Sequence, residues 1–166
     1  MILRPSQKLN ARIKGDTLGV LPRHENSLLD WSAHVFAVGR AEYVLVSNTT
    51  SLYSAVLDNA GLRDAARFTE RVQGIIRAVL EGAGAHTVVT NAVKSAQFAK
   101  TLDRSVTGSM NELIAHAAAL LIDSHLSVAD VAVRLNDILL SALAGGSNKY
   151  GRPRDVFAAL VAVAGA

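Results

Sequence analysis

Short apolar runs separated by turn residues occupy the first third of the chain. Val, Leu, Tyr and Phe gather at residues 33–38, 43–47 and 52–57, and segments that contain Gly, Asn, Thr and Ser separate these runs. Apolar runs of this length with short polar connections are typical of antiparallel hairpins. The pattern predicts a three-stranded meander. The apolar start of the chain, residues 1–4, predicts a further strand at one edge of the same sheet.

The periodicity becomes helical after the third of these strands. Between residues 62 and 80, apolar side chains recur at steps of three and four positions, which is the spacing of one helix face. Residues 91–101 and 110–121 also have a helical pattern. Residues 87–90, which lie between the helical patterns of 62–80 and 91–101, are too few to distinguish a fifth strand from a loop. The middle of the chain is therefore predicted to be mainly helical.

Two further helices are marked by residues that favour helix starts. Ser127 and Asp130 have the spacing of a capping box, with Asp in place of the usual Glu or Gln. The apolar stripe that follows continues to the Gly-Gly pair at 145–146. Pro153 begins the last helix, because proline is favoured at the first helical position.

Strands grouped early and helices grouped late predict an α+β fold. We expect a small antiparallel sheet, made of the N-terminal strand plus the three-stranded meander, covered on one face by several helices. No internal repeat or low-complexity linker divides the chain, so residues 1–166 are expected to form a single domain.

Composition indicates a globular protein and excludes several kinds of chemistry. Half of the 166 residues are hydrophobic and 19% are charged, which excludes a disordered tail. The chain has no Cys, so disulfides, thiolate metal sites and cysteine nucleophiles are excluded. No apolar run reaches the roughly 18 residues of a membrane span, and the first residues lack the apolar core of a signal peptide. We therefore expect a cytoplasmic protein without membrane contact.

Positive charge is concentrated near the two ends of the sequence. The net charge is +3, from 17 Lys and Arg against 14 Asp and Glu. Cations together with an aromatic ring are the residue types that contact nucleic acid. The candidates for such contacts are Lys8, Arg12, Lys149, Tyr150, Arg152 and Arg154. An ordinary solvated face has the same composition, and both readings stay open.

Familiar catalytic and phosphate-binding motifs are missing from the chain. Gly82 and Gly84 follow a predicted helix rather than a strand, which does not fit a dinucleotide-binding turn, and there is no P-loop, nucleophile elbow or zinc-protease motif. Glu112, His116 and Asp123 fall near one helix face but are too few for a preformed metal site. We expect no metal and no cofactor, and enzymatic activity stays open.

The start of the first central strand carries residues suited to acid–base chemistry. Asp30 and His34 fall on the same strand face, because strand side chains alternate, and Trp31 offers an aromatic surface beside them. A carboxylate and an imidazole can act as general acid and base. In the alternative, Trp31 packs in the core and His34 bonds a neighbouring backbone group. Trp31, Asn48 and Asn136 are also candidates for ligand binding.

A second group of candidates surrounds the expected start of the helix over 110–121. Free backbone amides at such a start, together with Arg104 and Ser109, could hold a phosphate or a carboxylate, with Asn111 as a further ligand-binding residue. Ordinary capping by Ser109 or Asn111 is the alternative.

Several short segments together resemble a known family. They are Met1-Ile2-Leu3-Arg4 with Gln7-Lys8-Leu9, Asp30-Trp31-x-x-His34, Tyr43-Val44-Leu45-Val46-Ser47-Asn48 followed by Leu52, Gly108-Ser109-Met110-Asn111-Glu112, Leu135-Asn136, and Tyr150 ahead of Arg152-Pro153. These segments are similar to a small bacterial family of uncharacterised proteins, a domain of unknown function of nearly this length. The strand motif of that family reads Asp-Trp-His-Ala-Asn, and this chain departs from it at Ser32 and His34. The resemblance implies a bacterial origin and one complete domain, and it implies no activity.

Three functions fit these observations. The first is a non-enzymatic binding module for nucleic acid or a protein partner, favoured by the basic ends of the chain and the missing catalytic motifs. The second is a small hydrolase or transferase, with Asp30 and His34 as an acid–base pair and an anion site at the predicted helix start. It requires the two groups to converge on one cleft. The third is a structural homo-oligomer, such as a homodimer, because the late helices are unusually apolar.

Overall fold

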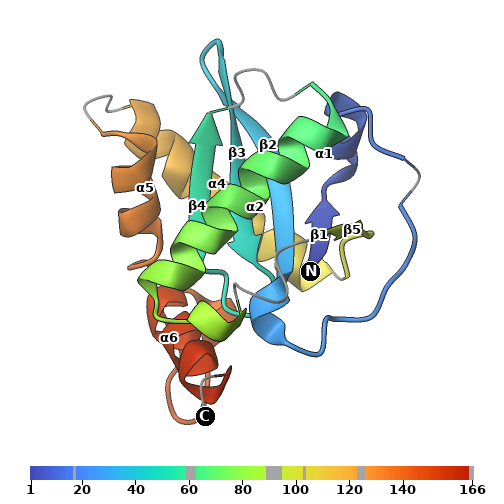
Figure 1. The fold of residues 1–166 in the computed structure, drawn as a ribbon. Coiled ribbons are helices and arrows are strands. Elements are labelled where there is room, and N and C mark those ends of the chain that lie inside the picture. Colours follow the sequence, from blue (N-terminus) through green and yellow to red (C-terminus); the bar gives the residue numbers. More distant parts are fainter. Residues whose placement is uncertain (17, 59–62, 89–94, 103, 123–125, 165–166) are drawn as a thin grey trace.

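A five-stranded sheet lies at the centre of the computed structural model, which describes residues 1–16, 18–58, 63–88, 95–102, 104–122 and 126–164 (Figure 1). Its strand order is β4-β3-β2-β1-β5. The strands are β1 (Ile2–Pro5), β2 (Asp30–Val38), β3 (Ala41–Asn48), β4 (Ser54–Asp58) and β5 (Gln97–Phe98). Strands β2, β3 and β4 pair antiparallel, which confirms the predicted meander and the α+β class.

The N-terminal strand lies inside the sheet, whereas the sequence pattern placed it at an edge. Strand β1 pairs in parallel with β2 on one side and with β5 on the other, so the sheet is mixed and not purely antiparallel. The prediction of a helix over 91–101 is wrong at Gln97 and Phe98, which form β5; residues 91–94 lie outside the described residues. A strand of two residues is too short to produce an alternating sequence pattern, which is why β5 was missed.

The α-helices are α1 (Gln7–Arg12), α2 (Ala65–Gly82), α4 (Arg104–Ile122), α5 (Val128–Leu135) and α6 (Pro153–Ala164). Helices α2, α4, α5 and α6 correspond to predicted helices, with shifted ends. Residues 86–88 are also helical, and short 3₁₀ turns cover Ser27–Leu29 and Ser141–Leu143. The start of α6 at a proline is confirmed.

The capping box of α5 is present as predicted. The Ser127 hydroxyl accepts from the amide of Asp130, and the Asp130 carboxylate accepts from the amide of Ser127. The predicted extension of this helix to residues 145–146 is wrong, because α5 ends at Leu135. The apolar residues beyond that point include Leu140, which is buried outside any helix.

Helices cover both faces of the sheet, whereas the sequence pattern predicted cover on one face only. On one face, Trp31 and Val44 belong to an apolar cluster with helix α2. On the other, Phe36 and Leu45 belong to a cluster with α4 and α5. Because side chains alternate along each strand, these two clusters lie on opposite faces. Both faces of β2 and β3 are therefore buried.

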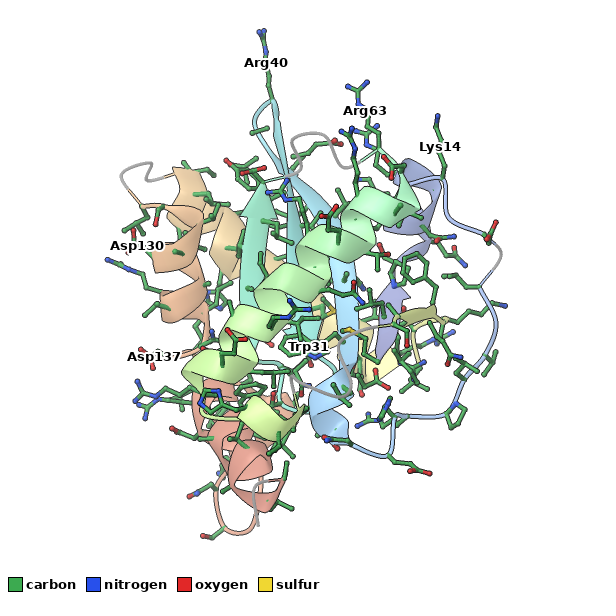
Figure 2. All side chains as sticks on the ribbon, viewed as in Figure 1. Lys14, Trp31, Arg40, Arg63, Asp130 and Asp137 are labelled. Atoms are coloured by element: carbon green, nitrogen blue, oxygen red, sulfur yellow. The ribbon has the colours of Figure 1, made fainter. Side chains whose placement is uncertain are left out.

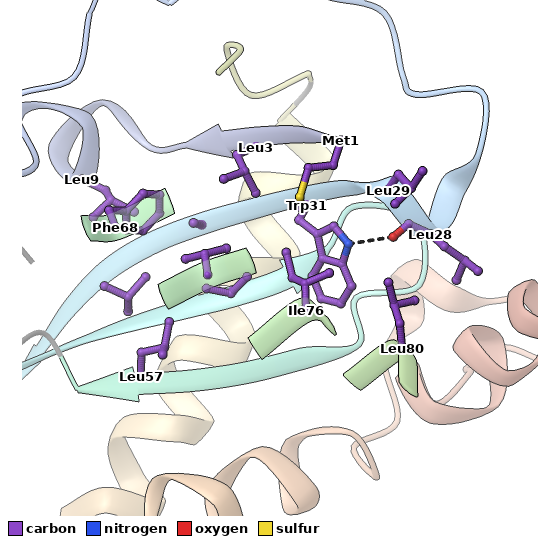
Figure 3. Packing of buried hydrophobic residues seen from close by; sticks show 14 of the residues in the cluster. Met1, Leu3, Leu9, Leu28, Leu29, Trp31, Leu57, Phe68, Ile76 and Leu80 are labelled. Atoms are coloured by element: carbon purple, nitrogen blue, oxygen red, sulfur yellow. Dashed lines mark hydrogen bonds between the residues drawn. The ribbon is translucent and has the colours of Figure 1, made fainter. Parts of the chain in front are cut away.

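The cluster under α2 contains the single Trp of the chain (Figure 3). Helix α2 buries Phe68, Val72, Ile76 and Leu80, which follow one another at steps of four residues and so form a single stripe. The indole ring of Trp31 is fully buried, and its Nε1 donates to the Leu28 carbonyl at 2.8 Å. Trp31 is therefore a core residue of the sheet.

Candidate functional site

A buried ion pair links the first two strands of the chain. Arg4 of β1 and Asp30 of β2 have side chains that are 0% and 1% exposed. The Nε and Nη2 atoms of Arg4 each donate to one carboxylate oxygen of Asp30 at 2.8 Å. This fork-to-fork arrangement is the strongest form of an arginine–carboxylate pair.

The remaining donors of Arg4 bind backbone carbonyls from other segments. Its Nη1 donates to Lys100 O at 2.9 Å and to Leu21 O at 3.2 Å, and its Nη2 donates to Pro22 O at 2.7 Å. All five N–H groups of the guanidinium are thus used. Arg4 joins the loop before β2 and the segment after β5 to the centre of the sheet.

The carboxylate of Asp30 is saturated with hydrogen bonds. Besides Arg4, it accepts from Thr49 Oγ1 at 2.8 Å and from the amide of His24 at 3.0 Å. Burial by itself would raise the pKa of Asp30, but the hydrogen bonds from Arg4, His24 and Thr49 outweigh it and hold the pKa below its ordinary value. Asp30 is therefore ionised and fully engaged inside the fold.

Polar side chains continue from this pair across four strands. Arg4 pairs in register with Ser32, Ser32 with Ser47, and Ser47 with Ser54. The Ser32 hydroxyl lies 2.9 Å from Thr49 Oγ1, and the Ser47 and Ser54 hydroxyls lie 2.6 Å apart. This polar row is buried beneath α4 and α5, on the face that otherwise carries the second apolar cluster.

The polar row ends at Asn136, one of the predicted ligand-binding residues. The amide group of Asn136 accepts from Ser54 N at 2.8 Å and donates to Ser54 O at 2.9 Å. Asn136 is also the residue at which helix α5 stops. The attachment of its side chain to the edge strand β4 explains why the helix ends here and not at the later glycines.

Asn48, another predicted ligand-binding residue, organises the turn between β3 and β4. Its Oδ1 accepts from the amide and the hydroxyl of Ser51, and its Nδ2 donates to Ser27 O at 2.7 Å and Asp30 O at 3.2 Å. The turn includes Leu52 at a φ of 58°, a conformation that nonglycine residues rarely adopt. These contacts occupy both ends of the Asn48 amide.

His34, on the same strand face as Asp30, lines a pocket of about 340 Å³. We call this the His34 pocket; its lining residues are Pro5, Ser6, Gln7, Leu18, His34, Lys100, Thr101 and Thr107. The side chain of His34 is 7% exposed, and burial lowers the pKa of the imidazole. Its Nε2 atom is buried and has no hydrogen-bond partner among the described residues. An unpaired buried polar atom of this kind costs about 1–3 kcal/mol.

The buried ion pair fixes one wall of the His34 pocket. The carbonyl of Lys100 accepts from Arg4, and the amide of Lys100 donates to Gly19 O at 2.8 Å. The next residue before Gly19 is Leu18, which also lines the pocket. Arg4 and Asp30 thus hold the backbone of this wall in place, although neither of them lines the pocket.

One protein-family model matches nearly the whole chain. The model of a domain of unknown function, DUF6933, matches residues 2–156. The chain belongs to this family. Neither a curated protein nor a solved structure matches it. Membership of DUF6933 confirms the expected resemblance to a domain of unknown function and indicates no activity.

The three candidate anion-binding residues of this DUF6933 chain do not lie on one surface. Helix α4 begins at Arg104, whereas the sequence pattern predicted a start at residue 110, because its buried stripe already includes Val106. Ser109 is buried and its hydroxyl donates to Ser105 O at 3.0 Å, whereas Asn111 is exposed. Residues two positions apart on a helix face nearly opposite directions. Ser109 and Asn111 therefore do not share a binding surface.

The candidate nucleic-acid contacts of the family member are divided between two ends of the molecule. Lys8 and Arg12 belong to α1, whereas Lys149, Tyr150, Arg152 and Arg154 lie in or just before α6, and these helices occupy opposite ends (Figure 1). All six residues are exposed. Arg12 is ion-paired with Glu42, and Arg154 with Asp137.

Figure 2 shows a related separation of charge. Lys14, Arg40 and Arg63 lie at the end of the molecule near α1 and the β2–β3 hairpin, whereas Asp130 and Asp137 lie along α5 and just after it. Among the described residues, Lys14, Arg40 and Arg63 form no ion pair. These three cations thus lie at one end of the molecule, on three separate segments of the chain.

Two further expectations concern metals and membranes. Within the described ranges, no three His, Asp or Glu side chains gather in a way that could hold a metal ion. Asp123, one member of the trio considered from the sequence, lies outside the described residues. None of the helices in the described part of the chain combines the length and the apolar content needed to cross a bilayer.

The sequence reasoning missed most residues that build the site. Arg4, Thr49 and Lys100 were not candidates, although one of them carried a signal. Arg4 is a charged residue inside the apolar segment that starts the chain, and a charge in a buried strand requires a partner. Lys100 had no comparable signal, because its position depends on the pairing of β5 with β1.

Proposed function

We propose that this protein is a non-enzymatic binding module whose ligand is a small molecule held in the His34 pocket. The observation that carries the proposal is the Nε2 atom of His34, which has no hydrogen-bond partner among the described residues. His34 is only 7% exposed and lines the pocket. Buried polar atoms almost always have a partner in folded proteins, so an exception suggests a site that a ligand completes. The size of the pocket lies within the range of small-molecule sites.

Four hollows on the described surface are larger than the His34 pocket. They measure about 660, 620, 430 and 400 Å³ and lie, in that order, between α2 and β5, beside the β2–β3 hairpin, between α2 and α6, and beside α1. None of the four is lined by a described side chain that has a buried polar atom without a partner. The chemistry of His34 therefore favours the smaller pocket over the larger ones.

Binding has more support than catalysis by an Asp30–His34 pair. The two residues are four positions apart on one strand, which separates their Cα atoms by about 13 Å at 3.3 Å per residue. A general acid and base that act together need to reach a common proton or substrate group. Asp30 already accepts four hydrogen bonds from Arg4, Thr49 and His24, so its proton-accepting positions are occupied.

A small ligand also has more support than nucleic acid. A nucleic-acid site needs several unpaired cations on one continuous surface. Here the candidate cations lie at two opposite ends, and Arg12 and Arg154 are engaged with carboxylates. A protein partner has no single described surface in its favour.

The proposal is tested by recording the histidine ring signals of the protein by NMR during titration with a library of neutral and charged small molecules. We expect binders to shift the His34 signals and to leave those of the exposed His116 unchanged. The matched variants are His34→Gln and His116→Gln, of which only the first should lose binding. If no compound in the library shifts the His34 signals, the proposed function is wrong.

A further inference from the structure

The class of ligand follows from the charges on the lining of the His34 pocket, and this step rests on the proposed function. Among the eight described residues that line it, Lys100 is the one cation and there is no carboxylate. Burial lowers the pKa of His34, so its imidazole is neutral at neutral pH. The lining therefore carries a single positive charge. We infer that the His34 pocket binds a small oxyanion, a carboxylate or a phosphate, through the ammonium group of Lys100.

The uncharged lining residues fit such a ligand. Ser6, Thr101 and Thr107 bring hydroxyl groups, which donate readily to carboxylate and phosphate oxygens. The hydroxyl oxygen of Ser6 accepts from the amide of Leu9 at 3.2 Å, so its own proton is directed elsewhere. Pro5 and Leu18 supply an apolar part of the lining. The pocket thus suits a small molecule with one anionic group and a short apolar part.

His34 contributes a donor that a bound oxyanion would use. In the tautomer with a proton on Nε2, the imidazole donates to the oxyanion and gains the partner that it lacks among the described residues. The Nε2 atom is itself buried, so this contact requires the side chain to rearrange locally. A neutral imidazole also avoids the cost of burying a second charge beside Lys100.

The position of Lys100 is prepared by the fold before any ligand arrives. Its carbonyl and its amide are held by Arg4 and by Gly19, so the backbone that carries the ammonium group is fixed. Binding then requires only the ordering of the lysine side chain and not of the segment. Preorganisation of this kind increases affinity because less conformational freedom is lost on binding.

Calorimetric titration with butyrate, inorganic phosphate and the neutral butyramide tests this inference. We expect at least one of the two anions to bind about tenfold or more tightly than butyramide, because charge-assisted hydrogen bonds are stronger than neutral ones. Tighter binding of phosphate than of butyrate assigns a phosphoryl group, and the reverse assigns a carboxylate.

Two lysine variants distinguish binding through the pocket lysine from binding through the overall positive charge of the protein. Lys100→Met keeps the length of the side chain. It should weaken the binding of whichever of the two anions binds the unchanged protein more tightly, by about tenfold or more. Lys149→Met removes a charge near α6 and should leave the affinity unchanged. Equal affinity for butyramide and the anions, or an unchanged affinity in Lys100→Met, would overturn the oxyanion inference.

The outcome also distinguishes this inference from the proposed function. If neutral compounds shift the His34 NMR signals while no anion binds, the oxyanion inference is wrong and the proposed function stands. If neither neutral nor anionic compounds shift those signals, the pocket is not a ligand site and both proposals fail.

Discussion

The guanidinium of Arg4 and the carboxylate of Asp30 form a two-point ion pair, with two contacts of 2.8 Å, at the boundary between strands β1 and β2. The pair is buried in the sheet, yet its remaining hydrogen bonds reach the loop at Leu21 and Pro22 and the segment at Lys100. It therefore connects the sheet to the wall of the His34 pocket.

Removing one partner of the buried pair should strongly destabilise the fold. Arg4→Met leaves the Asp30 carboxylate buried without its counter-charge, which costs about 3–5 kcal/mol. The free energy of unfolding in urea measures the effect. The double variant Arg4→Met/Asp30→Asn should recover part of the loss, because no charge then remains buried.

The exposed pair Arg67–Asp64 provides the control for this measurement. The side chain of Arg67 is 73% exposed, so Arg67→Met should change the free energy of unfolding very little. If Arg4→Met unfolds at the same urea concentration as the unchanged protein, the pair does not support the fold in the way described.

His34 should make the stability depend on pH in weakly acidic solution. The unfolded chain protonates this residue near its ordinary pKa of about 6.5, whereas burial lowers the pKa of His34 in the fold. Below about 6.5 the unfolded state then binds more protons, so the free energy of unfolding falls as the pH drops toward the folded pKa. Above about pH 6.5 this loss in the free energy of unfolding is absent.

Urea unfolding at a series of pH values checks this dependence. His34→Gln should flatten the curve between about pH 6.5 and the folded pKa, while His116→Gln should not. Asp30 affects stability in a more acidic pH range, because its pKa is lowered in the fold. Its ionised carboxylate stabilises the fold above the ordinary carboxyl pKa, and this stabilisation is lost as the pH falls through the pKa of Asp30 in the folded state. An unchanged slope in His34→Gln would show that His34 titrates alike in both states.

Asn136 should be more important for stability than for any ligand. Asn136→Ala removes both hydrogen bonds to the backbone of Ser54 and leaves that backbone unpaired in a buried position, which costs about 1–3 kcal/mol. Asn111→Ala, on the exposed side of α4, is the matched control and should have little effect. Thermal unfolding compares the two. Equal melting temperatures for both variants would contradict the link between α5 and β4.

Nucleic-acid binding should be weak at physiological salt. Because the candidate cations lie at opposite ends, we expect a dissociation constant for single-stranded oligonucleotides no tighter than the nonspecific range of about 10⁻⁴ to 10⁻⁶ M. Fluorescence anisotropy at several salt concentrations measures it. Tight binding that weakens steeply with salt, and that is lost in Lys149→Met/Arg152→Met, would restore the nucleic-acid module as the better function.

Parts of the chain with a strong local pattern were predicted well. The meander follows from apolar runs with short turns, and the start of α5 follows from the capping residues Ser127 and Asp130. Both depend on residues that are neighbours in the sequence. The sequence also pointed to Asp30 and His34 as unusual polar residues in a strand, and both are buried.

The missed features depend on contacts between distant segments. The chemistry of Asp30 could not be inferred without Arg4, which reaches it only because β1 pairs with β2. The end of α5 could not be inferred because it depends on the contact of Asn136 with Ser54, 82 residues away. Likewise, the helix start that suggested an anion site moved because Val106 fills the core beneath α4.

The amino-acid sequence by itself determined the α+β class, the meander, the order of the helices and the absence of cysteine chemistry, because local periodicity and composition are sufficient for these. Only the tertiary structure decided that helices cover both faces of the sheet, that β1 lies inside it, and that Lys100 meets His34 at one pocket. The physical reason is that strand pairing and side-chain burial bring together residues that no local pattern relates. The His34 pocket exists only through such pairing.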